Sequence, residues 1–330
     1  MLDLMTLLVI VILLALVFDA INGFHDTANA IATSVSTRAL SPYVAVILAA
    51  TFNFLGAIAG TAVAKTIGKG IVDSQLVNMH TFTAAMLAAI LWNLITWYFG
   101  FPSSSSHALI GGLVGAAIAS GGLKTVIVHG LVGKVLIPLV ISPVVGYLIG
   151  YLLMTIFYWL FGWFPPGKIN NSFRRMQIFS ACTAAFSHGS NDAQKTMGII
   201  TLALFSASVI PEFTVPTWVK IACAIAMGIG TASGGWRIIK TMGTKIFKMD
   251  PIHGFAADVT SSIVIYGASL MGIPVSTTHV VSSSILGVGS AKRFSAVNWQ
   301  IAINVVIAWV LTIPATGTVA YLVYYLIRGM

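Results

Sequence analysis

The chain has 330 residues, of which 58% are hydrophobic and only 8% are charged. Soluble globular domains carry about a quarter charged residues, so this composition excludes an ordinary water-soluble enzyme or binding domain. The formal charge of +9 does not indicate a nucleic-acid partner, because lysine and arginine in a membrane protein mark cytoplasmic loops and meet anionic lipid headgroups. The expected surroundings are a lipid bilayer.

Long apolar runs recur along the whole chain. They lie at roughly 2–21, 41–64, 80–100, 125–161, 196–210, 218–233, 254–273 and 299–327. The longer runs can cross a hydrocarbon core about 30 Å thick, and they are continuous, unlike the alternating strands of a membrane barrel. The first run lacks the basic start and the cleavage site of a signal peptide. We predict an all-α, multi-pass integral membrane protein.

The first polar interruption is N-G-F-H-D-T-A-N-A-I at 22–31. A carboxylate within a span is costly and usually faces a partner or a cavity. Gly and Asn favour a broken helix, whose freed carbonyls can join a carboxylate and an amide oxygen around a hard cation. We expect Asp26 and Asn29 to bind a hard cation such as Na⁺, and Asn22 and His25 to serve in gating or a third cation site. A helix-capping role for Asp26 is the alternative.

The second interruption is G-F-P-S-S-S-S-H at 100–107. Proline and serine favour the start of a helix, where unpaired N–H groups, hydroxyls and the helix dipole attract an anion. We expect an anion to bind at Ser103, Ser104, Ser105 and Ser106. The segment 102–120 is short and interrupted, so we predict that it forms a re-entrant hairpin inside the protein. Hydroxyls that only satisfy the backbone of packed helices are the alternative.

Both motifs recur in the second half of the chain. H-G-S-N-D-A-Q-K at 188–195 aligns Asp192 with Asp26, and G-I-P-V-S-T-T-H at 272–279 aligns with 100–107. We therefore predict two homologous repeats, 1–161 and 176–330, joined by a linker at 162–175. A second re-entrant hairpin is expected at 274–290.

The second repeat supplies matching site residues. Gly189, Ser190 and Asn191 favour a helix break before Asp192, as Asn22 and Gly23 do before Asp26. Asn191 and Asp192 are predicted Na⁺ ligands, and an anion is expected at Ser276, Thr277 and Thr278. Gln194 and Lys195 are further candidates for the anion, although Lys195 can instead form an ion pair with Asp192. Asp258 has no counterpart in the first half, which suggests a third cation ligand or a gating contact.

Loop charges indicate how the halves are oriented. The loop 236–250 contains four basic residues and one acidic residue, and the linker 162–175 also contains three basic residues, so both are expected to be cytoplasmic. The first half would then begin outside and the second inside, which is an inverted-topology repeat common among secondary transporters. The Lys292–Arg293 pair lies on the opposite side and argues against this orientation.

Other chemistries fit less well. The four motif histidines lack the spacing of a zinc site. A Ser–His hydrolase is disfavoured because the G-x-S-x-G elbow is absent and the Ser–His motif occurs twice. We predict no catalytic residues, no enzymatic activity and no cofactor besides the coupling ion. An anion channel whose serine-rich segments act as filters is a competing class.

These motifs resemble those of the inorganic phosphate transporter (PiT) family. The resemblance is carried by G-F-H-D-T-A-N-A (23–30), F-P-S-S-S-S-H (101–107), H-G-S-N-D-A-Q-K-T-M-G (188–198) and I-P-V-S-T-T-H (273–279). His25 stands where the usual signature has Asn. The resemblance implies a compact prokaryotic form that imports phosphate with a cation across the plasma (inner) membrane, with inverted repeats and both termini outside.

The predicted function is a symporter that imports inorganic phosphate with Na⁺ by alternating access. Na⁺ is preferred to H⁺ because amide and hydroxyl oxygens beside each aspartate suit a coordinated ion, whereas a proton needs only the carboxylate. H⁺ coupling and sulfate transport stay open. G-x-x-x-G spacings at Gly56/Gly60 and Gly146/Gly150 permit close helix contacts, within one chain or between copies in a homo-oligomer.

Overall fold

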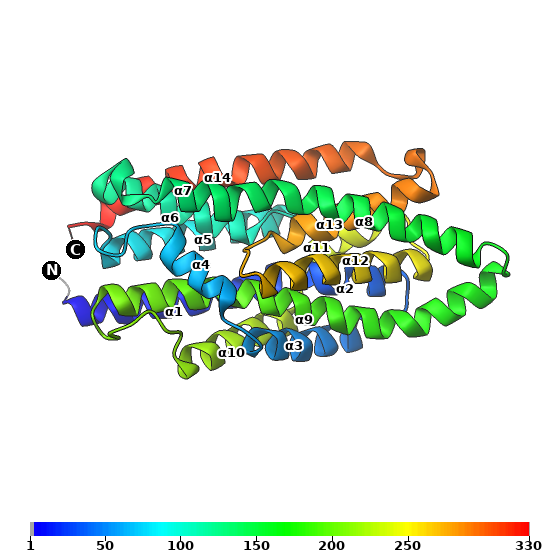
Figure 1. Cartoon of the computed structure of the whole chain (residues 1–330), viewed down its shortest axis with the longest axis horizontal. Helices are drawn as coiled ribbons and strands as arrows, with labels where there is room; N and C mark the ends of the chain where they lie inside the picture. Colours follow the sequence, from blue (N-terminus) through cyan, green and yellow to red (C-terminus); the bar gives the residue numbers. More distant parts are fainter. Residues whose placement is uncertain (1–2, 330) are drawn as a thin grey trace.

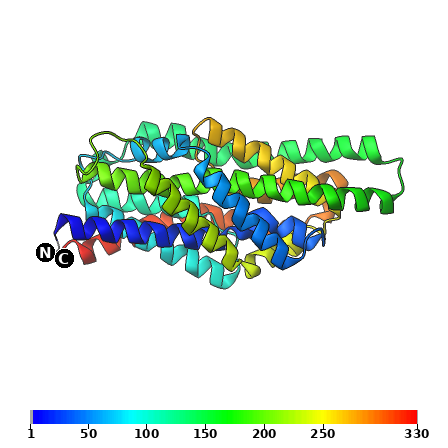
Figure 2. The ribbon, with the colours of Figure 1, turned by 90° about the horizontal axis from the view of Figure 1, so that it is seen from below.

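The computed structural model describes residues 3–329, and within that range every named element is a helix. The helices run roughly along one long axis, and α1 begins at the same end of the molecule where α14 finishes (Figure 1; Figure 2). The first half contains α1 (Leu4–His25), α2 (Thr27–Ser36), α3 (Pro42–Ile58), α4 (Ala62–Gly70), α5 (Met79–Phe99), α6 (Ser105–Gly121), α7 (Val128–Leu131) and α8 (Ile137–Phe161).

The second half contains the two longest helices, its first and its last. It contains α9 (Pro166–Ser206), α10 (Thr217–Ser233), α11 (Trp236–Lys240), α12 (Pro251–Leu270), α13 (Thr277–Lys292) and α14 (Trp299–Ile327). Short π-helical turns at Val132–Leu136 and Thr241–Lys245, and 3₁₀ turns at Leu123–Thr125 and Phe294–Ala296, join some of these helices.

Several helical stretches are long and apolar enough to cross a bilayer. They are Leu4–Ser36, Met79–Phe99, Val128–Phe161 and Trp299–Ile327, and the pair α3–α4, bent by 66°, is a fifth candidate. This confirms the all-α prediction with several apolar helices of membrane length. The apolar runs predicted at 196–210, 218–233 and 254–273 also fall on helices, α9, α10 and α12.

The longest helix, α9, takes in most of the predicted linker. Only residues 162–165 between α8 and α9 are non-helical, because Pro165 and Pro166 stop one helix and start the next. A helix of 41 residues is about 60 Å long, twice the hydrocarbon thickness. The end of α8 and the start of α9 therefore project beyond the other helices (Figure 2).

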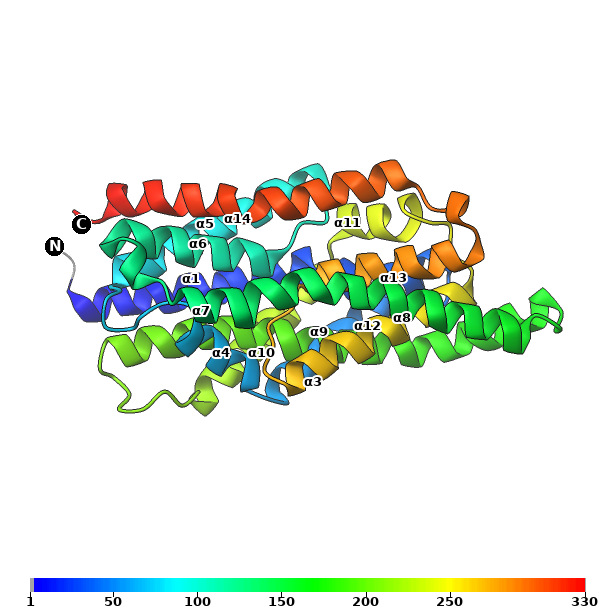
Figure 3. The same ribbon diagram turned by 45° about the horizontal axis from the view of Figure 1, so that its top comes forward.

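The predicted fold-back inside 102–120 and 274–290 is wrong. Each segment forms one helix, α6 or α13, which packs against the preceding helix, α5 or α12. Ser104 and Ser276 cap these helices by accepting hydrogen bonds from the backbone N–H groups of His107 and His279, at 3.1 and 3.3 Å. The helix thus starts inside the motif, and the turn lies before it. Figure 3 places the α5–α6 and α12–α13 pairs toward opposite ends of the long axis.

Close glycine contacts link the two halves reciprocally. A Cβ atom at any of four glycines would lie 1.9–2.5 Å from a backbone oxygen of the other half. These contacts are Gly23 with Met227, Gly230 with Ala20, Gly189 with Asn53, and Gly56 with Phe186. Helix α1 thereby packs against α10, and α9 packs against α3.

The predicted G-x-x-x-G contacts occur within this chain. Gly146 and Gly150 of α8 face Ser283 and Ser284 of α13, and Gly56 of α3 faces α9. Gly60 lies near the side chain of Gln194. These glycines therefore serve intramolecular packing, which leaves the predicted homo-oligomer without support from them.

Candidate functional site

Four sequence motifs converge on one buried cluster. Asp26 and Asp192 are 2% and 1% exposed, and the threonines that follow Ser276 contact both carboxylates. The α5–α6 and α12–α13 connections also meet here, since the Ser106 hydroxyl lies 3.4 Å from the Val275 carbonyl. The two halves therefore supply a single shared site.

Asp26 lies at the break between α1 and α2. Its backbone (φ −95°, ψ 6°) departs from helical geometry, as the Gly- and Asn-containing sequence predicts. Its Oδ1 is 2.6 Å from His25 Nδ1 and accepts a hydrogen bond from Thr278 Oγ1 at 3.4 Å. His25 Nε2 in turn lies 3.1 Å from Thr96 Oγ1 of α5. His25 therefore orients Asp26 and connects it to α5.

Asp192 lies within the uninterrupted helix α9, so the predicted helix break is wrong for the second motif. Its Oδ1 forms an ion pair with the Lys195 ammonium, one helical turn away. Its Oδ2 accepts a hydrogen bond from Thr277 Oγ1 at 2.9 Å and lies 3.1 Å from His188 Nε2. Lys195, Thr277 and His188 therefore surround this carboxylate. Because α9 is continuous here, its backbone carbonyls are not freed to join Asp192 around a cation.

Asp26, Asp192 and His188 form a compact potential cation site. One ligand atom from each lies within 4.8 Å of the others, and all three residues are buried. His188 was not among the residues predicted to bind the cation. Its position four residues before Asp192 places both on one face of a helix, and that spacing was the available signal.

Asn29 forms hydrogen bonds with the two threonines that contact Asp192 and Asp26. Its Nδ2 donates hydrogen bonds to Thr277 Oγ1 and Thr278 Oγ1 at 3.3 and 3.0 Å. Its Oδ1 is buried and has no hydrogen-bond partner among residues 3–329. Because buried polar atoms are nearly always paired, this amide oxygen is suited to a ligand, as the prediction for Asn29 requires.

Lys195 joins the cation cluster to the serine motif. Its Nζ donates to Ser106 Oγ at 2.5 Å and to the Val275 carbonyl at 2.7 Å, in addition to its ion pair with Asp192. The neighbouring Ser105 hydroxyl is buried without a partner in the described range. Lys195 therefore lies beside the Asp192 carboxylate and beside the start of α6. This position is compatible with both predicted roles, an ion pair with Asp192 and contact with an anion.

Three predicted site residues hydrogen-bond to groups other than the two carboxylates. Ser103 Oγ lies 2.9 Å from Trp92 Nε1 and 3.2 Å from Thr312 Oγ1, between α5 and α14. Gln194 accepts a hydrogen bond from the backbone N–H of Val63 at 2.8 Å and so holds the start of α4. Asn191 Nδ2 donates to Ser269 Oγ at 2.9 Å, which steadies the α12–α13 connection.

The remaining candidates also lie outside the central contacts. Asp258 accepts hydrogen bonds from Thr33 and Ser180 at 2.6 and 2.9 Å, in a separate polar cluster of α2, α9 and α12. Asn22 Oδ1 is buried with no partner among the residues described, and the Asn22 carbonyl accepts from the Asp26 N–H. Neither contact places Asp258 or Asn22 directly in the carboxylate cluster.

The chain matches a family model as well as several whole proteins. The model described as "Phosphate transporter family" matches residues 22–320. The chain belongs to this family. This confirms the resemblance drawn from the motifs, and it also confirms that the protein is a transporter and not an enzyme.

Relatives match this phosphate transporter over nearly its full length. A "Probable low-affinity inorganic phosphate transporter" of Bacillus subtilis (strain 168) is 50% identical, with 98% of each chain covered. Another with the same description, from Rhizobium meliloti (strain 1021), is 49% identical, with 97% of this chain and 96% of the relative covered. A solved structure described as "The sodium-dependent phosphate transporter" has a TM-score of 0.88 at 26% identity, covering 98% of this chain and all of that one.

Proposed function

We propose that this phosphate transporter is a Na⁺-coupled symporter that imports inorganic phosphate across the plasma membrane by alternating access. The observation that carries the proposal is the meeting of two carboxylates, one from each half, with the starts of α6 and α13 in one buried cluster. The similar solved structure is described as a sodium-dependent transporter, which supports the choice of sodium.

The charges of the cluster explain why anion and cation would bind together. With neutral histidines, Asp26, Asp192 and Lys195 leave one net negative charge, which repels HPO₄²⁻. Removing ions from water is costly unless opposite charges compensate. Cations on the carboxylates would turn this repulsion into attraction, and phosphate would in turn strengthen cation binding. This mutual dependence is the physical basis of symport.

We assign separate roles within the cluster. Na⁺ would bind near Asp26, Asp192 and the free oxygen of Asn29, whereas phosphate would bind beside Ser105, Ser106 and Lys195 at the start of α6. Thr277 and Thr278 donate hydrogen bonds to both aspartates, so they would link cation binding to the start of α13. Backbone N–H groups at both helix starts would complete the anion site.

The reciprocal glycine contacts support an inverted-repeat architecture. Gly23 and Gly189 are separated by the same 166 residues as Asp26 and Asp192. Gly23 packs on α10, which returns the contact through Gly230, and Gly189 packs on α3, which returns it through Gly56. Helix α1 begins and α14 finishes at one end of the long axis, and the α8–α9 turn between the halves lies at the other end (Figure 1). Each half therefore runs from one end of the molecule to the other, as it would if it crossed a membrane an odd number of times. Such repeats suit a transporter with its site near the bilayer midplane.

Burial of the cluster favours alternating access over an anion channel. Asp26, Asp192, Lys195 and Ser106 are each at most 4% exposed. A channel filter must form part of a continuous pore when open, whereas a symporter closes its site between the two sides. To open the site toward either side, the α5–α6 pair would have to separate from the α12–α13 pair.

Uptake into proteoliposomes tests coupling and selectivity together. We expect phosphate uptake under an inward Na⁺ gradient to exceed uptake in choline by at least about tenfold, since the site needs its cations. Sulfate should compete weakly. Uptake that persists in choline and falls as external pH rises would replace Na⁺ with H⁺, and non-saturating flux would favour a channel.

The hydroxyl of Thr277 provides a finer test. Thr277→Val keeps the shape but removes the hydrogen bond to Asp192, so we expect the Na⁺ concentration for half-maximal uptake to rise about 5- to 30-fold for a loss of roughly 1–2 kcal/mol. The matched control is Thr318→Val on the exposed face of α14, which should leave this concentration unchanged. Equal Na⁺ dependence in both variants would contradict the role of Thr277.

A further inference from the structure

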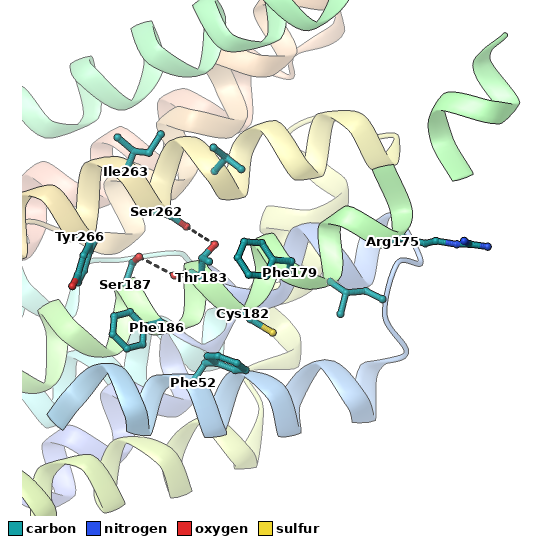
Figure 4. Close-up of a pocket in the computed structure, with 12 residues that line it drawn as sticks. Phe52, Arg175, Phe179, Cys182, Thr183, Phe186, Ser187, Ser262, Ile263 and Tyr266 are labelled. Carbon is teal, nitrogen blue, oxygen red and sulfur yellow. Dashed lines mark hydrogen bonds between the residues drawn. The ribbon is translucent and has the colours of Figure 1, made fainter. Parts of the chain in front are cut away.

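A large groove opens on the outer face of the molecule, away from the transport site. It lies between α3, α9 and α12 and has a volume of about 810 Å³. Figure 4 shows its walls, which are mainly apolar side chains: Phe52, Ile178, Phe179, Phe186, Ile263 and Tyr266. Phe179 is 72% exposed and Ile263 is 57% exposed, so the protein itself does not cover this surface.

The serine and threonine hydroxyls in the groove are already hydrogen-bonded. Thr183 Oγ1 donates to the Ser180 carbonyl at 2.9 Å and pairs with Ser262 Oγ at 3.3 Å, while Ser187 Oγ donates to the Thr183 carbonyl at 2.8 Å. Ser262 also donates to the Asp258 carbonyl. With its hydroxyls engaged in these bonds, the groove floor presents a surface suited to hydrocarbon.

One end of the groove is cationic. Arg175 lines this end (Figure 4). It also lines an adjoining polar depression formed by Gly167, Lys168, Asn171 and Ser172. These residues follow one stripe of α9, which changes from polar at 168–175 to apolar at 178–186. Neither Lys168 nor Arg175 forms an ion pair with any acidic side chain in the described range 3–329.

The stripe has the depth profile of a membrane interface. Arg175 precedes Asp192 by 17 residues, which is about 25 Å along a helix. If Asp192 lies at the midplane, as the proposed function places it, Arg175 lies at the water-facing edge of the headgroup layer, since half of the roughly 40–45 Å spanned by hydrocarbon and headgroups is about 20–22 Å. Phe186 lies well inside the hydrocarbon.

We propose that this groove binds an anionic phospholipid, with an acyl chain along the α3–α9–α12 walls and the headgroup phosphate on Arg175. Arginine presents two N–H groups that match a phosphate, and the charge of Arg175, unpaired within residues 3–329, favours a net negative headgroup over a zwitterionic one. A second copy of the chain fits less well, because a two-fold interface on this face would bring identical cationic stripes together.

Photolabelling of the full-length protein tests the site. A phosphatidylglycerol analogue with a photoreactive group in its acyl chain is incorporated into nanodiscs, and labelled peptides are mapped by mass spectrometry. We expect labels on 178–186 and 259–266, and at least about fivefold less labelling in Arg175→Ala. Arg174→Ala is the matched control, since its neighbouring cation does not line the groove, and it should label as the wild type does.

Further arms separate the remaining explanations. Ser262→Trp, which fills the groove, should also reduce labelling, and a phosphatidylethanolamine analogue should label more weakly. Equal labelling by both lipids, or labelling unchanged in Arg175→Ala, would overturn the proposal. Cross-links between copies through the groove, in place of lipid labels, would assign the face to a dimer. The transport-site variant Asp26→Asn should label normally, so failure of the transport proposal leaves this result unaffected.

Discussion

Asp192→Asn is expected to abolish Na⁺-driven phosphate uptake. The substitution removes the negative charge that would hold the cation and leaves the buried Lys195 ammonium without its carboxylate. Breaking a buried ion pair on one side also destabilises the fold by about 3–5 kcal/mol, so the effect on uptake has to be separated from an effect on folding. Initial uptake rates in proteoliposomes, with reconstituted protein quantified, measure the effect.

A double variant separates transport from folding. Asp192→Asn alone can fail to fold because of the unpaired ammonium, but Asp192→Asn with Lys195→Met removes both charges, which proteins often tolerate without loss of stability. We expect the double variant to elute as the wild type does in size-exclusion chromatography and still to lack uptake. Normal uptake in this variant would remove the ion pair from the mechanism. Glu212→Gln, at an exposed position, should transport normally.

Gly189→Ala is expected to damage the fold severely, although it adds a single methyl group. The new Cβ would lie 2.1 Å from the Asn53 carbonyl oxygen and 2.7 Å from Asn53 Cα. A helix backbone cannot move aside as a flexible side chain can, so α3 and α9 would have to separate. Overpacking of this kind costs about 1–3 kcal/mol or more, and thermal unfolding in detergent should show a clear fall in unfolding temperature.

The matched control is Gly267→Ala in α12, where a Cβ would meet nothing within 4 Å. Alanine is the better helix former by about 0.5–1 kcal/mol, so this variant should be equal to or slightly more stable than the wild type. Gly230→Ala should behave as Gly189→Ala does, because its Cβ would lie 1.9 Å from the Ala20 carbonyl oxygen. Similar unfolding temperatures for Gly189→Ala and Gly267→Ala would contradict close packing of α3 on α9.

Local patterns accounted for the helices and the helix starts. Apolar run lengths predicted the long helices, and the serines before His107 and His279 predicted caps that the structure places at Ser104 and Ser276. The same patterns led to the wrong prediction that 102–120 and 274–290 each fold back on themselves. The residues that start a helix are the same whether its partner is the preceding helix or a following one. Which neighbour packs against α6 depends on the tertiary contact with α5, far outside the motif.

Adjacency in the motif was a poor guide to which side chains meet. Successive residues of a helix point about 100° apart, so in the continuous helix α9 Gln194 bonds to α4 while Lys195 pairs with Asp192. Asn191 bonds to the α12–α13 connection. Spacings of three and four residues do share a face, and the structure brings together His188, Asp192 and Lys195. The incorrect helix break predicted at Asp192 concealed this periodicity.

The sequence by itself determined the membrane class, the two motif pairs, the family and the two aspartates, because hydrophobicity and short-range chemistry are written locally in the chain. Only the tertiary structure decided that both aspartates share one cluster, that His188 joins them, and that Ser103 and Gln194 hydrogen-bond to other groups. Those outcomes depend on contacts such as Thr277 with Asp192 and Thr278 with Asp26, between residues 85 and 252 positions apart. Packing of the two halves sets these contacts, and neither motif contains that information alone.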